Sequence, residues 1–364
     1  MTRMRVPSLG AVTLLLVLWP AAVSSASWVT RDSRAAPRGP WRGALSRELP
    51  LLYREFNGID FGHAHLAETL LRGRRSPAEV ESARIEVLRF IARMPAVPPD
   101  ESQIAPGFTR LVWRLQRTLD WTHLFHRSLY DLFASGRVKD KRAAYKRLLA
   151  KYLASPDAIT PRPLDHHGRL WSFPESRSFR DSFPEFNSQI WAYHWLQAAA
   201  YDVQLLGAAG KQRELMPAIL TEYHRYLRKP PTEWRFMPLM AEVAPRFSSE
   251  YPEAASIFDN LHMLHDNVDD ILTRHDLFPT RAKQRDAILR VRRIYLARNH
   301  QRAGPLAEYE LSPGERALDA QGAHAKELHG EMVLHGPGAV EGAEEPLGPR
   351  PPSADDVLRA SGKP

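Results

Sequence analysis

The chain contains 364 residues, of which 43% are hydrophobic and 25% are charged, and its formal net charge is +8. This composition excludes a chain that is disordered throughout, a collagen-like polymer and a membrane protein with several spans. The absence of cysteine also excludes disulfides, iron–sulfur clusters, covalently attached c-type haem and a cysteine nucleophile.

The N-terminus has the pattern of a secretory signal peptide over residues 1–26. Arg3 and Arg5 form a charged start, an apolar run follows over residues 9–18, and the small residues at 24–26 suit a signal peptidase. The apolar stretch only reaches the lower limit of the length that a membrane helix needs. We therefore expect cleavage, export to the periplasm or the cell exterior, and no membrane span after signal removal. The alternative is an uncleaved N-terminal anchor.

After a flexible segment at 27–46, residues 47–302 are expected to form one all-α domain. Ser76 and Glu79 have the spacing of a capping box, which starts a helix that continues to Ile91. No stretch shows the sustained alternation of apolar and polar residues that is typical of half-buried strands. The pattern predicts a bundle of about seven or eight amphipathic helices. The other helical segments are 47–72, 107–135, 140–154, 187–207, 211–228, 253–275 and 281–299.

The end of the chain differs in composition from the rest. Residues 303–364 contain eleven acidic and five basic residues, a net charge of −6, and they lack Phe, Trp and Ile. Such a segment cannot bury enough apolar surface to offset the loss of chain entropy. We therefore predict a disordered acidic tail. Within the domain, residues 155–186 are expected to form a long loop, and no internal repeat is evident.

Basic residues concentrate in two segments, 137–151 and 281–302. A basic helix can contact nucleic acid or anionic lipid. Apolar residues such as Ile288, Val291 and Ile294 are interleaved with the arginines of the second segment, as in an amphipathic helix with one solvated face. We therefore expect no nucleic-acid partner, and the choice between a protein and a small-molecule partner stays open.

Histidines stand on the faces of four predicted helices. His63 and His126 occupy places in apolar stripes, where a helix that faces the core carries hydrophobic residues. His194 shares its face with other polar residues and is flanked by two tryptophans. Further histidines and carboxylates lie on the same or adjoining faces, within reach along a helix. They are His65 and Glu68, His123, and the group of His262, His265, Asp266 and Asp269.

The chemistry of imidazole gives this pattern its meaning. A buried imidazole without a partner costs roughly 1–3 kcal/mol, so several in one core need a shared partner. Helical bundles build cofactor sites by projecting ligands inward, and imidazole suits iron, copper and zinc, while added carboxylates favour iron or manganese. We therefore predict a core site for one of these transition metals, which can be redox-active. The predicted ligands are His63, His65, Glu68, His123, His126, His194, His262, His265, Asp266 and Asp269.

Two other functions fit the same sequence. One is a non-covalent haem held by two histidines from facing helices, and the other is an exported module that binds a partner without catalysis. The sequence contains no phosphate-binding loop, no Gly-x-Ser-x-Gly elbow and no His-Glu-x-x-His motif, so it names no reaction. Convergence of the histidines in space is the condition on which the metal hypothesis depends.

Overall fold

The computed structural model describes residues 41–73, 76–164, 173–234, 236–300 and 350–363. These residues form helices and their connections, with one isolated bridge between Ile159 and Leu296. The prediction of an all-α fold is therefore confirmed. None of the described helices is long and apolar enough to cross a membrane. The predicted signal peptide lies outside the described residues.

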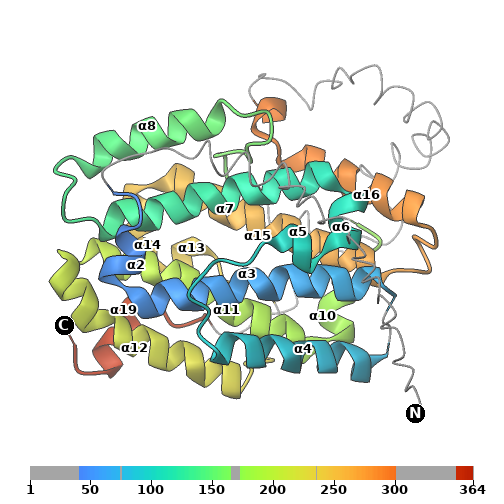
Figure 1. The fold of residues 1–364 in the computed structure, drawn as a ribbon, viewed down its shortest axis with the longest axis horizontal. Coiled ribbons are helices and arrows are strands. Elements are labelled where there is room, and N and C mark those ends of the chain that lie inside the picture. The colour runs from blue at the N-terminus through green and yellow to red at the C-terminus, as the bar shows by residue number, and fades with distance from the viewer. Residues whose placement is uncertain (1–40, 74–75, 165–172, 235, 301–349, 364) are drawn as a thin grey trace, which may run out of the picture.

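Four helices of 22 residues each form the centre of the molecule (Figure 1). α3 and α7 each pack against both α11 and α15. α11 is the most enclosed of the four, because every residue from Phe186 to Gln204 except Gln197 is buried. The four central helices are α3 (Pro50–Leu71), α7 (Trp113–Ala134), α11 (Pro184–Leu205) and α15 (Pro252–Thr273).

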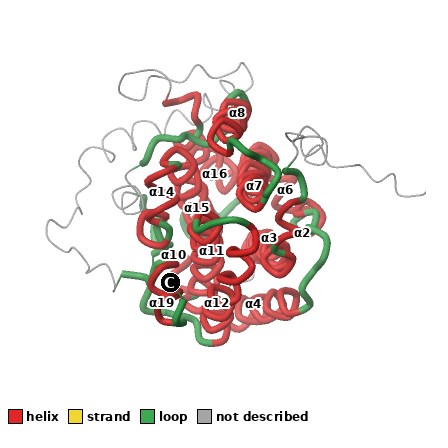
Figure 2. Tube along the Cα trace, turned by 90° about the vertical axis from the view of Figure 1, so that its left-hand side faces the viewer, coloured by secondary structure: helices red, strands yellow, loops and turns green. Residues whose placement is uncertain are grey.

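A second helix follows each central helix and packs on it. In Figure 1, α8 lies along the top of the bundle and α4 and α12 along the bottom, and the end view of Figure 2 shows the same arrangement. The predicted capping box is present, since the Ser76 hydroxyl accepts a hydrogen bond from the Glu79 N–H. These outer helices are α4 (Pro77–Ala92), α8 (Lys141–Leu153), α12 (Ala209–Arg228) and α16 (Arg281–Tyr295).

A short helix also precedes each central helix. One residue joins the two helices, and its backbone is nearly the same in all four places, with φ between −132° and −135° and ψ between 48° and 62°. Proline begins three of the central helices, where its missing N–H is not needed. The short helices are α2 (Ala44–Glu48), α6 (Pro106–Leu111), α10 (Ser178–Ser182) and α14 (Pro245–Glu250). The remaining helical pieces are α5 (Glu101–Ile104), α13 (Met240–Val243), η1 (Ala297–His300) and α19 (Ala354–Ala360).

A carboxylate near the end of each central helix binds the N-terminus of a short helix. Carboxylates are stabilising there because they satisfy free N–H groups and complement the helix dipole. The capping is reciprocal within two pairs of central helices. The carboxylate of α3 caps the short helix that precedes α7, and the carboxylate of α7 caps the short helix that precedes α3. α11 and α15 form the second such pair. The acceptors and donors are Asp131 with Gly43 and Leu45, Glu68 with Gly107 and Phe108, Asp270 with Arg177 and Phe179, and Asp202 with Arg246 and Phe247.

These features recur at fixed spacing. Counted from the first residue of each central helix, the capping carboxylate is always residue 19. A buried apolar residue always lies five positions before the helix begins. The expectation of no internal repeat is therefore wrong, because the described chain contains four copies of a short helix, a central helix and an outer helix. The apolar residues are Leu45, Phe108, Phe179 and Phe247.

Residues 350–363 fold onto the bundle, which corrects the prediction of a tail that is disordered to residue 364. α19 packs against α11 and α12 and buries Val357 and Leu358. The indole N–H of Trp195 donates a hydrogen bond of 2.8 Å to the carbonyl of Pro352. Residues 303–349 lie outside the described residues, so the tail prediction is not tested there.

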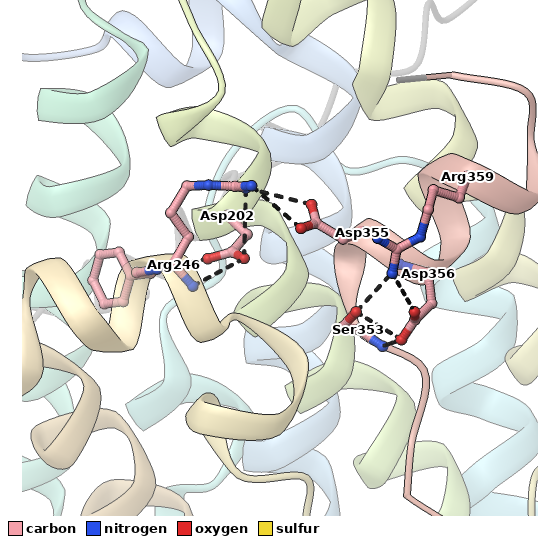
Figure 3. Close-up of polar contacts among 7 residues, drawn as sticks. Asp202, Arg246, Ser353, Asp355, Asp356 and Arg359 are labelled. Atoms are coloured by element: carbon pink, nitrogen blue, oxygen red, sulfur yellow. Dashed lines mark hydrogen bonds and ion pairs between the residues drawn. The ribbon is translucent and has the colours of Figure 1, made fainter.

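Arg246 ties this C-terminal segment to the core (Figure 3). Its guanidinium lies 3.2 Å from the carboxylate of Asp355 and 3.9 Å from that of the buried Asp202. At the other end of the chain, residues 41–46 belong to the predicted flexible segment, yet α2 begins at Ala44 and its Leu45 is buried. Both ends of the described chain are therefore packed more extensively than composition predicts.

Candidate metal centre

The central helices bring five histidines together in the interior of the bundle. Neighbouring ring centroids lie 3.6 to 6.3 Å apart. We call these five residues the histidine cluster. They are His63 on α3, His123 on α7, His194 on α11, and His262 and His265 on α15.

A glycine allows α3 and α11 to approach closely at this level. A Cβ atom on Gly62 would lie 2.9 Å from the ring of Tyr193, so only glycine fits without a shift of the helices. The Tyr193 ring in turn packs edge-on against His63, with centroids 5.8 Å apart. This close approach holds His63 against His194.

His63, His194 and His265 each present one ring nitrogen, and the three atoms lie within 4.8 Å of one another. The Nε2 atoms of His63 and His194 are 3.2 Å apart. An ion bound tetrahedrally at about 2.0–2.1 Å from each nitrogen holds two nitrogens about 3.3–3.4 Å apart. The Nε2 atoms of His63 and His194 are therefore already close to the separation of two metal ligands. His63 is partly exposed, whereas His194 and His265 are buried.

The second ring nitrogen of His194 faces a sulfur atom. Its Nδ1 lies 2.9 Å from the Sδ of Met237. A thioether accepts a hydrogen bond and cannot donate one, so this contact favours a proton on Nδ1. The lone pair of His194 then lies on Nε2, directed at His63. Ligating histidines show this division, with one nitrogen on the metal and the other donating to a neighbour.

The carboxylate of Glu101 lies next to one ring nitrogen of His123. The Nδ1 of His123 lies 3.3 Å from Oε1 of Glu101 on α5. Burial lowers the pKa of His123, but Glu101, with help from Asp60 and Asp120, outweighs burial and raises it. Burial alone would raise the pKa of Glu101, and the contact with His123 lowers it instead. The pair leaves Nε2 of His123 as its metal-binding atom, in the carboxylate–histidine–metal arrangement of many proteins.

The other four members of the cluster are neutral near pH 7. Burial lowers the pKa of each well below its ordinary value, and neighbouring imidazoles lower it further. Neutral imidazole is the form that binds metal ions. Among the described residues, no hydrogen-bond partner reaches the buried Nδ1 atoms of His63, His262 and His265. A cation bound by His265 through Nδ1 would offset the cost of that unsatisfied nitrogen, about 1–3 kcal/mol.

The structure places two predicted ligands of α3 away from the cluster. His65 lies two residues after His63 and therefore on another face of the helix. Its Nε2 is 3.1 Å from Glu86, and its ring stacks on Phe61. Glu68 accepts hydrogen bonds from the N-terminus of α6 and from Arg72. Both side chains serve helix packing and capping.

The two predicted carboxylate ligands of α15 also have other surroundings. Asp266 forms a buried ion pair of 3.4 Å with Arg180, and burial raises its pKa to about 6. Burial, Asp266 and Asp270 raise the pKa of Asp269 well above its ordinary value, which favours the protonated acid. The centre that the described side chains form is therefore built from imidazole rather than carboxylate.

His126 adjoins the cluster through an aromatic ring. It packs edge-on against Phe258 at 5.3 Å between centroids, and Phe258 also packs edge-on against His262 at 4.0 Å. The Nδ1 of His126 lies 2.8 Å from the hydroxyl of Tyr201. Burial lowers the pKa of His126 to about 3, so this ring is neutral as well.

Sequence reasoning missed two residues that shape this centre, Glu101 and Met237. Each lies outside the four histidine-bearing helices, Glu101 on a helix of four residues and Met237 between helices. Helical periodicity gives no signal for such positions, because only the packed fold brings them to the rings.

The comparisons with known proteins supply no assignment. No family model, no curated protein and no solved structure matches the chain. The function is therefore inferred from the geometry and chemistry of the histidine cluster.

Proposed function

We propose that the protein binds a divalent transition-metal ion in the histidine cluster. His63, His194 and His265 are the ligands, and His123, supported by Glu101, is the fourth. The observation that carries this proposal is the meeting of three ring nitrogens from three separate helices within 4.8 Å. Imidazoles that face one another in a core gain most from a shared cation when a buried nitrogen, here Nδ1 of His265, has no other partner.

The donor set narrows the choice of metal. Imidazole nitrogen suits iron, copper and zinc, whereas manganese prefers a larger share of oxygen ligands. The predicted carboxylates Glu68 and Asp266 have other partners, so the ligands that we propose are nitrogen atoms. We propose iron, copper or zinc ahead of manganese. Iron or copper would make the centre redox-active, and zinc would not.

Metal analysis of matched variants tests the proposal. We expect purified wild-type protein to retain metal or to take up Zn²⁺ or Cu²⁺, and we expect His63→Ala to lower the affinity at least tenfold. His65→Ala is the matched control, since it removes an imidazole two residues away on α3 and should leave affinity unchanged. Folded protein that takes up neither ion contradicts the proposal. A Soret band in the native protein would show that the site binds haem instead of a single metal ion.

We further propose that the protein acts after export from the cytoplasm. The support is the charged start, apolar run and small residues over residues 1–26. Expression of the full chain, followed by fractionation and N-terminal sequencing, tests this. A mature chain that begins near residue 27 outside the cytoplasm is the expected result, and an unprocessed cytoplasmic chain contradicts it.

A further inference from the structure

The four central helices are copies of one unit, and the histidine cluster occupies equivalent positions in them. Residues 11 and 14 of each helix lie one turn apart on one face. Residue 11 is Asp60, His123, His194 or His262, and residue 14 is His63, His126, Gln197 or His265. All eight carry a nitrogen or oxygen atom that can bind a metal ion. The four ligands of the proposed centre are two from each position.

The repeat also relates the two halves of the chain. Each half contains two units in the same order, joined by reciprocal capping, so α3 corresponds to α11 and α7 to α15. Each proposed ligand has an equivalent position in the other half of the chain, and these equivalent positions form a second set of four residues. His63 becomes Gln197, His123 becomes His262, His194 becomes Asp60, and His265 becomes His126.

Three members of the second set have a buried polar atom with no partner among the described residues. These atoms are Nε2 of His126, Oε1 of Gln197 and Nδ1 of His262. The fourth member, Asp60, is bound by Arg127 instead. Three unsatisfied atoms at symmetry-related positions are costly, and a shared cation would offset that cost.

Packing on one aromatic ring connects two of these side chains, and the third is placed near them by its position on α11. His126 and His262 pack on the same ring, Phe258. On α11, Gln197 lies three residues after His194, whose ring centroid is 3.6 Å from that of His262. Gln197 also lies four residues before Tyr201, the hydrogen-bond partner of His126.

The hydroxyl of Tyr201 lies beside His126 and can set its tautomer. In one arrangement the hydroxyl donates to the carbonyl of His126 at 3.4 Å and accepts from Nδ1–H of the same residue at 2.8 Å. With the proton on Nδ1, the lone pair lies on Nε2, the atom without a partner. In this arrangement the ring has the tautomer that binds a metal ion through Nε2.

We propose that His126, Gln197 and His262 form a second cation site beside the first, so that the loaded protein contains two divalent transition-metal ions. This inference rests on the proposed function of the histidine cluster. The second site offers two imidazole nitrogens and one amide oxygen, against four imidazoles in the first. We therefore expect weaker binding there, with open coordination positions for water or a small oxygen-bearing substrate.

Titration with Co²⁺ of the metal-free full chain, followed by calorimetry and by visible absorption, tests the second site. We expect two ions per chain, with the second bound at least tenfold more weakly. His126→Ala and Gln197→Leu should each remove the weak phase and keep the tight one. Gln197→Leu nearly preserves side-chain volume and keeps the backbone carbonyl that accepts from Tyr130, so it is the milder change. His224→Ala, which removes a partly exposed histidine paired with Glu55, is the control.

The outcomes separate the two proposals. A single tight ion in wild type that persists in His126→Ala overturns the second site and leaves the first intact. A weak phase that persists in both folded variants also overturns it. Loss of the tight phase in either variant, with the circular dichroism spectrum and melting temperature of wild type, would place these residues in the first centre instead. No uptake by folded wild type overturns both proposals.

Discussion

Glu101 shows how one side chain sets the chemistry of another. Its carboxylate lies 3.3 Å from Nδ1 of His123 and, despite burial, raises the pKa of that ring. In the metal-free protein the contact stabilises the imidazolium, and in the loaded protein it orients the ring for coordination through Nε2. Metal uptake at this ring therefore releases a proton, and affinity should fall at low pH.

Replacement of this carboxylate should weaken metal binding. We expect Glu101→Gln to lower the affinity for Zn²⁺ about 10–100-fold, the usual effect of removing the partner of a ligating histidine. Competition with a chromophoric chelator measures the change. The control is Glu86→Gln, which alters the carboxylate beside His65, outside the cluster. Equal affinities for Glu101→Gln and wild type would show that Glu101 does not position a ligand.

Asp202 is a buried carboxyl whose titration should appear in protein stability. Burial raises its pKa to about 6, against the hydrogen bonds from Phe247 and Arg246. The unfolded-state pKa is about 3.9. Because the folded value is the higher one, this group contributes stability that is fully present below about pH 3.9 and is lost as pH rises through about 6.

Comparison of wild type with Asp202→Asn isolates this contribution. The difference in the free energy of unfolding, wild type minus variant, should fall by about 1 kcal/mol between pH 5 and pH 7. Urea unfolding at a series of pH values measures it. Asp276→Asn should show no such trend, because the bond from Arg274 lowers the pKa of Asp276 to about 2. A rise of the difference with pH would contradict the assignment.

At the scale of elements, hydrophobic periodicity located the long helices and missed the short ones. The predicted helix 253–275 corresponds to α15, but the predicted helix 107–135 is divided at Val112 into α6 and α7. A single extended residue between two helices hardly changes the 3.6-residue spacing of apolar side chains, so periodicity does not detect the break. Helices of four to six residues are also too short to show a period, and here distant carboxylates stabilise their N-termini.

The same physics explains which site residues could be predicted. His63 was predicted because a polar ring at a core position breaks an apolar stripe, and His194 because it shares its face with other polar residues between two tryptophans. Glu68 resembled a ligand because a carboxylate three residues after a histidine lies beside it on the helix. Its true partners, Gly107 and Phe108, lie about 40 positions away, and no local pattern connects them. The repeat was overlooked because only a few positions in each copy carry it.

The capping role of Glu68 gives a prediction that separates stability from binding. Glu68→Ala should lower the free energy of unfolding by roughly 1–3 kcal/mol, because two backbone N–H groups of α6 lose their acceptor. Metal content should stay at the wild-type value. Glu48→Ala, which removes a partly exposed partner of Arg213, should change stability by less than about 0.5 kcal/mol. Loss of metal from a folded Glu68→Ala variant would restore Glu68 as a ligand.

At the scale of the whole molecule, four copies of one unit enclose the cluster, and α19 is an addition to them. α19 lies on the outside of α11 and α12, and a groove of about 610 Å³ runs along its contact with α12. The contact is therefore incompletely packed. Polar links of this segment to the bundle include the Trp195–Pro352 hydrogen bond and the Arg246–Asp355 ion pair.

Removal of residues 350–364 tests whether this segment is structural or part of the metal centre. Truncation exposes the apolar surface that Val357 and Leu358 cover, so the free energy of unfolding should fall by roughly 2–4 kcal/mol after the entropy of ordering the segment is deducted. The number of metal ions bound should not change, because none of the described contacts joins α19 to the cluster. Arg359→Ala, which removes an exposed pair within α19, should leave both quantities unchanged. A truncated chain that folds but binds fewer ions would mean that Trp195, held by this segment, positions the adjacent His194.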